Sequence, residues 1–149
     1  MATIPQFLRP IYISSLYRYD VYPKMLSLWT EFAASLDAFI NDETFEEYSN
    51  RAKRLRCIGN KDCSTIVDFV EAVKEMKGIV YDETIKQSML EKYEKADKND
   101  PKVQEKVTIV LKVYDAANKF FNFAQKSING SITYKGSANS FISYTLNFW

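Results

Sequence analysis

The sequence contains no histidine among its 149 residues. Histidine is the commonest general base near neutral pH, and it completes most Ser and Cys catalytic triads and most zinc sites. The sequence also has no glycine-rich phosphate loop and no Cys-x-x-Cys redox motif. The paired carboxylates Glu46-Glu47 and Asp82-Glu83 fall at the starts of predicted helices, where acids favour the helix dipole. We therefore predict that the protein is not an enzyme and holds no cofactor or metal.

Cysteine and long apolar runs are scarce as well. Cys57 and Cys63 are too few for a disulfide scaffold, and without histidine they cannot complete a zinc tetrahedron. We predict two free thiols, with a disulfide between them as the alternative. No stretch approaches the ~18 apolar residues of a membrane span. The N-terminal residues 1–14 contain Pro5 and Pro10 and no long apolar run. We therefore expect no signal peptide and no membrane partner.

Neither sign of charge is in excess, because 20 Lys and Arg balance 19 Asp and Glu to a net charge of +1. Such a chain has no strong nonspecific attraction to nucleic acid as a whole, although a local basic stripe is compatible with it. What is plentiful is hydrophobic surface, since 46% of the residues are hydrophobic and 15% are aromatic. This amount suffices for one folded domain over residues 1–149 and argues against disorder.

Hydrophobic periodicity predicts an all-α fold, a four-helix-bundle-like domain of up-down topology. Apolar residues recur at steps of three and four after Tyr22, and Pro23 suits a first helical turn. Prolines and β-branched residues before Tyr22 favour an extended arm instead. The predicted elements, in chain order, are an arm over residues 1–21, helices over 22–39, 41–59 and 62–77, an extended link at 79–81, helices over 82–96 and 101–128, and a non-helical tail over 129–149.

The longest predicted helix carries a narrow polar stripe. Its apolar residues cover most of its circumference, which indicates burial on more than one side. The stripe consists of Lys112, Asp115, Lys119, Asn122 and Lys126. Three lysines seven residues apart form a ladder about 20 Å long. One interpretation is a row of contacts to the phosphates of a nucleic-acid strand; the other is the solvated face of an amphipathic helix.

Both ends of the sequence are aromatic and carry little charge. If these ends were exposed to solvent, they would form hydrophobic patches of the kind that mark protein–protein contacts. This predicts contacts between subunits. The alternative is that both ends close over the core of one subunit. The candidate subunit-interface residues are Phe7, Tyr12, Tyr17, Phe141, Tyr144, Phe148 and Trp149.

Short motifs in both ends and in the long helix resemble the coat proteins of rod-shaped, tobamovirus-type plant RNA viruses. The first is Tyr12-Ile13-Ser14-Ser15-Leu16-Tyr17 followed by Pro23, and the second is Lys112-Val113-Tyr114-Asp115-Ala116. The last is Gly130, Tyr134, Ser140-Phe141-Ile142-Ser143 and Trp149. The family usually has Arg in its central link, where this sequence has Asp82. Coat proteins of archaeal rod-shaped and filamentous viruses are also small and helical and stay a second possibility.

The resemblance implies a coat protein that assembles with copies of itself into a helical tube, found in the virion and the host cytoplasm. Single-stranded RNA would lie against the long helix, with Lys112, Lys119 and Lys126 at phosphates and Asp115 and Asn122 at sugar or base. Arg51 and Arg54 would face the same groove. The family also pairs carboxylates between subunits; candidates here are Glu46, Glu47, Glu91 and Glu94. The alternatives are a monomeric or dimeric helical protein that binds a protein partner and, third, an enzyme with a carboxylate-bound metal.

Overall fold

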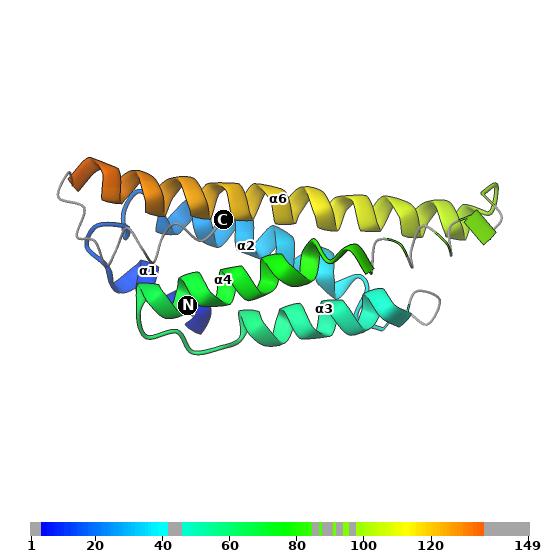
Figure 1. Cartoon of the computed structure of the whole chain (residues 1–149), viewed down its shortest axis with the longest axis horizontal. Coiled ribbons are helices and arrows are strands. Elements are labelled where there is room, and N and C mark those ends of the chain that lie inside the picture. Colours follow the sequence, from blue (N-terminus) through cyan, green and yellow to red (C-terminus); the bar gives the residue numbers. More distant parts are fainter. Residues whose placement is uncertain are drawn as a thin grey trace.

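The computed structural model describes residues 4–41, 46–84, 87, 91, 94–95 and 98–135, and their side chains as far as residue 128. This part of the chain is all-helical and contains no strand, as the sequence predicts. Its elements are the 3-10 helix η1 (Gln6–Leu8) and the α-helices α1 (Arg9–Ile13), α2 (Tyr22–Asp37), α3 (Glu46–Gly59), α4 (Ile66–Val80) and α6 (Pro101–Lys135) (Figure 1). Most of the helix predicted over 82–96 lies outside the described residues.

The longest helix, α6, runs the length of the molecule beside α2 (Figure 1). The two helices are antiparallel, because Lys24 near the start of α2 lies over the ring of Phe123, while Leu36 near its end lines the same small cavity as Val113. Below them, α3 packs against α4 and α2, and α4 packs against α6. The 35 residues of α6 span about 52 Å, whereas the 16 of α2 span about 24 Å. Part of α6 therefore extends beyond its neighbour.

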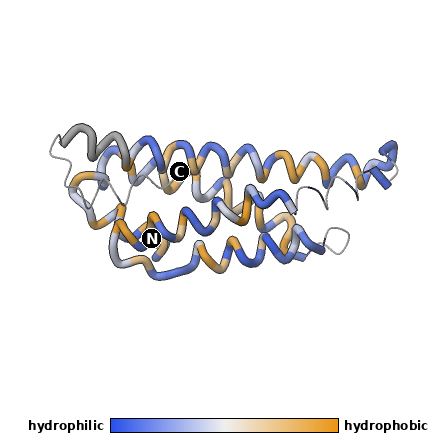
Figure 2. Tube along the Cα trace, in the orientation of Figure 1, coloured by the Kyte–Doolittle hydropathy of each residue, from blue (hydrophilic) through white to orange (hydrophobic). Residues whose placement is uncertain are grey.

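Hydrophobic and hydrophilic residues alternate along each helix, as the tube in Figure 2 shows. The buried hydrophobic residues form one cluster, to which η1, α1, α2, α3, α4 and α6 all contribute side chains. An aromatic group lies in it, with ring centroids of Phe7 5.0 Å from Trp29, 5.1 Å from Phe69 and 6.1 Å from Phe120. Aromatic pairs at these separations add to the stability gained from burial alone.

The prediction of an extended arm over residues 1–21 is wrong for residues 6–13, which are helical. Prolines stop a helix only in its interior: Pro5 caps η1 and Pro10 lies in the first turn of α1, where no amide hydrogen is needed. Phe7, Leu8 and Ile11 are fully buried in the core. Burial of these side chains outweighs the weak extended preference of β-branched residues.

Two helix ends also differ from prediction. The helix α4 continues through Gly78 to Val80 instead of ending before an extended link, and α6 continues through Gly130 to Lys135. The predicted tail is therefore helical over 129–135, and 136–149 lie outside the described residues. An interior glycine costs a helix only about 1 kcal/mol, which the burial of Ile79 and Val80 offsets in α4. The helix α4 begins at Ile66, four residues later than the predicted start at residue 62, because Thr65 and Asp68 form a reciprocal capping box there.

Both cysteines are free, as predicted, but they differ in reactivity. Cys57 is exposed, whereas burial and the nearby Asp68 raise the pKa of Cys63 to about 11. A thiol reacts as its thiolate, which Cys63 forms only as the pH rises towards that value. At about pH 8 we expect one fast-reacting thiol per folded chain and a second only after unfolding. Thiol counting with a chromogenic disulfide reagent measures this, and two fast thiols would contradict it.

Candidate nucleic-acid interface

All five residues of the predicted polar stripe lie on the solvent-exposed side of α6. Successive residues of an α-helix are about 100° apart around its axis, so the five fall within a strip about 80° wide. They are Lys112, Asp115, Lys119, Asn122 and Lys126, and each is exposed. The opposite side of α6 is buried and apolar. The stripe is thus a continuous polar surface about 21 Å long on a rigid support.

The charges along this stripe are unevenly compensated. The ammonium of Lys119 lies 3.1 Å from a carboxylate oxygen of Asp115, and both side chains are mostly exposed. The hydrogen bond to Asp115 and its charge raise the pKa of Lys119, with a smaller contribution from Glu31 on α2. Among the described residues, no acid lies within ion-pair distance of Lys112 or Lys126. The uncompensated positive charge therefore lies towards the two ends of the stripe.

Packing of α2 beside α6 adds a cation that the sequence reasoning missed. The ammonium of Lys24 lies 4.9 Å from the ring centroid of Phe123, which borders the stripe on the α2 side. A lysine at the start of a helix gives no signal of its own, because only the packing shows which helix it faces. We call the surface formed by Lys24, Glu31 and the five stripe residues the α2–α6 face. It carries four lysines and two acids, a net charge of +2.

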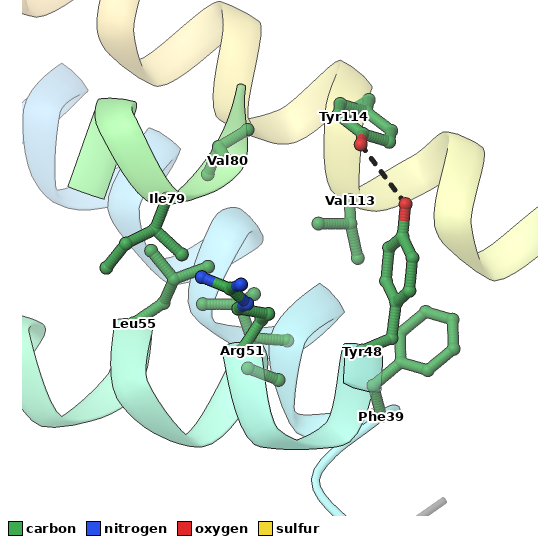
Figure 3. A pocket seen from close by; sticks show the side chains of 10 residues that line it. Phe39, Tyr48, Arg51, Leu55, Ile79, Val80, Val113 and Tyr114 are labelled. Atoms are coloured by element: carbon green, nitrogen blue, oxygen red, sulfur yellow. Dashed lines mark hydrogen bonds between the residues drawn. The ribbon is translucent and has the colours of Figure 1, made fainter. Parts of the chain in front are cut away.

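Arg51 does not face the stripe, in contrast to the expectation. It lines a small cavity of about 30 Å³, room for about one or two water molecules, between α3, α4 and α6 (Figure 3). Its guanidinium lies 3.7 Å from a carboxylate oxygen of Asp82. Tyr114 lines the same cavity and is about 160° around α6 from Lys112, so Arg51 does not join the lysines. Arg54 is exposed on α3, which packs against α2 and α4.

Tyrosine hydroxyls tie α6 to α3 and to the residue that follows α4. The hydroxyl oxygens of Tyr48 and Tyr114 are 3.1 Å apart (Figure 3). Tyr81 donates a hydrogen bond to the Asn118 side chain. Burial, followed by the hydrogen bond to Tyr114, raises the pKa of Tyr48 above its ordinary value. Burial also raises the pKa of Tyr81. These groups therefore stay neutral at physiological pH and serve to join helices.

The predicted subunit-interface residues separate into three groups. Phe7 and Tyr17 are buried in the core of the chain itself, which corrects their assignment to a free surface. Tyr12 is half-buried between the ring of Tyr22 and the guanidinium of Arg18. Phe141, Tyr144, Phe148 and Trp149 lie outside the described residues. For residues 6–13, the alternative of an end that closes over its own core is the one observed. The candidate carboxylates Glu46, Glu47, Glu91 and Glu94 are all exposed.

Comparison of the chain with protein-family models, with curated proteins and with solved structures finds no match. Within the described helices, none combines the length and the hydrophobicity needed to cross a membrane. In the same part of the chain, no group of three or more Cys, Asp and Glu residues is placed to hold a metal ion. A functional interpretation therefore depends on the sequence motifs and on the geometry of the α2–α6 face.

Proposed function

We propose that the protein is a structural coat protein that self-assembles into a helical rod or filament and packages single-stranded RNA along its α2–α6 face. The observation that carries the proposal is the regular row of exposed lysines on one straight, well-supported helix. We further propose that α2, α3, α4 and α6 form a four-helix-bundle-like domain within one unit over residues 1–149. The coat protein would be found in the virion and the host cytoplasm, in keeping with the resemblance of its motifs.

The chemistry of the α2–α6 face suits sequence-tolerant binding. Lysine ammonium groups act as point charges towards phosphate oxygens and read no base edges. Successive lysines of the stripe are about 10 Å apart along α6, so a strand lying along the helix would meet one at regular intervals. Asp115 and Glu31 hold the net charge of the face to +2. A low charge per subunit limits the repulsion between many identical copies placed side by side.

Neutralising the stripe tests the RNA assignment. Each phosphate contact to single-stranded nucleic acid contributes about 0.7 to the slope of log affinity against log salt concentration. The variant Lys112→Gln/Lys119→Gln/Lys126→Gln is therefore expected to lower that slope by about 2 and to stop RNA packaging, with an unchanged helical circular dichroism signal. Fluorescence anisotropy with a labelled oligonucleotide, titrated at several salt concentrations, gives the slope.

A matched control removes the same charge from outside the α2–α6 face. Lys53 is exposed on α3, Lys61 between α3 and α4, and Lys74 on α4. Their replacement by Gln should leave the slope near that of the unaltered protein. If the stripe variant and the unaltered protein have the same slope of log affinity against log salt concentration, the stripe lysines do not contact RNA and the proposal for the α2–α6 face is wrong.

Negative-stain electron microscopy, with and without single-stranded RNA, tests the assembly itself. Rods or stacked discs are expected, because helical assembly requires a contact that does not close on itself. Small particles of uniform size under every condition would instead favour the second candidate, a monomeric or dimeric helical protein that binds a protein partner.

A further inference from the structure

Three large apolar side chains are exposed within seven residues, at the last residue of α1 and in the turn that follows it. Ile13 is 52% exposed, Leu16 38% and Tyr19 77%. The turn that carries them has a defined shape, because the Arg18 Nε donates a 2.8 Å hydrogen bond to the carbonyl of Tyr12 and Tyr17 is buried beneath. We call Ile13, Leu16 and Tyr19 the N-terminal patch. Side chains of this size gathered on a fixed turn are typical of a surface that another segment covers.

The N-terminal patch lies at the end of the molecule where α6 finishes. Figure 1 shows α1 and the orange end of α6 at the same end of the helical body. The contact of Lys24 with Phe123 agrees, since it joins the start of α2 to the C-terminal half of α6. The end of α6 at Lys135, after which residues 136–149 follow in the sequence, therefore lies at the same end of the molecule as the patch.

Residues 136–149 have the composition that this patch requires. They contain no charged residue. Their large hydrophobic residues are Phe141, Ile142, Tyr144, Leu146, Phe148 and Trp149. A chain of this length spans up to about 46 Å when extended, so the distance from Lys135 to the patch is within reach. An apolar segment on a short tether also has an effective concentration near the mM range, well above that of a second copy in dilute solution.

We propose that the segment of residues 140–149 binds the N-terminal patch of the same chain. The apolar side chains of the segment cover Ile13, Leu16 and Tyr19 and remove both surfaces from water. This contact is independent of RNA packaging, because it uses neither the stripe lysines nor Lys24. It gives the aromatic end of the sequence a partner within one subunit.

Fluorine NMR of the full chain labelled with 5-fluorotryptophan tests the proposal. The chain has two tryptophans, Trp29 in the core and Trp149 in the segment, so two resonances are expected and W149F assigns them. The Trp149 resonance should lie away from its position in urea. The double variant Leu16→Ser/Tyr19→Ser should move it to that position, while the Trp29 resonance stays in place and reports an intact core.

The control is Leu111→Ser, which alters a 63% exposed apolar residue about 36 Å along α6 from Lys135. It should leave the Trp149 resonance unchanged. The measurement runs from micromolar protein to about 0.1 mM, below the effective concentration of a short tether. A Trp149 resonance already at the urea position, or one that ignores the double variant, overturns the proposal. A resonance that shifts with protein concentration also overturns it, because a second copy is then the occupant.

Discussion

Replacing Phe7 by Ala is expected to lower the free energy of unfolding by about 3–5 kcal/mol. Phe7 is fully buried, and its ring lies within 5.1 Å of both Trp29 and Phe69, measured between centroids. Truncation removes apolar area from the core and leaves a cavity that the surrounding helices fill only in part. Most domains are stable by only 5–15 kcal/mol, so the loss is a large fraction of the total.

Chemical denaturation followed by far-UV circular dichroism measures the Phe7→Ala effect. For a domain of this size, a loss of this magnitude lowers the melting temperature by about 10 °C. Leu111→Ala is the matched control, since it truncates an apolar side chain that is 63% exposed and should change stability by less than about 0.5 kcal/mol. If Phe7→Ala costs no more than Leu111→Ala, the N-terminal segment is a loose arm after all.

The prediction for Phe7 depends on a contact that local sequence signals do not reveal. Pro23 and Pro101 mark helix starts correctly, because a proline in the first turn acts within a few residues. The place of Phe7 depends instead on the assembly of α2, α4 and α6 around it. Residue periodicity says that a side chain is buried, but not which distant helix it meets. The local propensities of the residues before Tyr22 therefore predicted an extended arm, whereas tertiary packing stabilises η1 and α1 there.

Three predicted helices, over residues 41–59, 62–77 and 101–128, end at or within two residues of a glycine, but only one of these glycines lies at an observed helix end. The helix α3 ends at Gly59 as expected, whereas α4 passes through Gly78 and α6 through Gly130. The cost of an interior glycine is small against the gain from buried neighbours such as Met76 and Ile79. A glycine in the sequence therefore favours a helix end without requiring one.

The candidate site shows the same division between local and long-range information. Spacings of three and four residues are enough to place Lys112, Lys119 and Lys126 on one side of a helix. The contribution of Lys24 and the separation of Arg51 both depend on which helices are neighbours of α6. A single helix pattern carries no such information, so the sequence predicted the stripe but not its surroundings.

Replacing Gly59 by Ala is expected to destabilise the protein by about 1–3 kcal/mol, the usual cost of overpacking. Gly59 is buried at the end of α3, and the indole ring of Trp29 lies where a Cβ atom would stand. Trp29 is itself buried against Phe7, Phe32 and Phe120, so its ring cannot swing away without disturbing the aromatic group. The effect is purely steric, which separates it from the conformational role of glycine at helix ends.

Gly78→Ala is the matched control and should change stability in the opposite direction. Gly78 is exposed inside α4, and a Cβ atom there would have no neighbour within 4 Å. Alanine favours the helix and lowers the entropy of the unfolded chain, so a gain of about 0.5–1 kcal/mol is expected. Urea unfolding of the two variants compares them directly.

The double variant Trp29→Phe/Gly59→Ala tests the same contact. Its free energy of unfolding should fall by less than the sum of the losses in the two single variants, because the smaller ring makes room for the methyl group. Strict additivity, or a gain of stability in Gly59→Ala, would mean that Trp29 does not pack on Gly59.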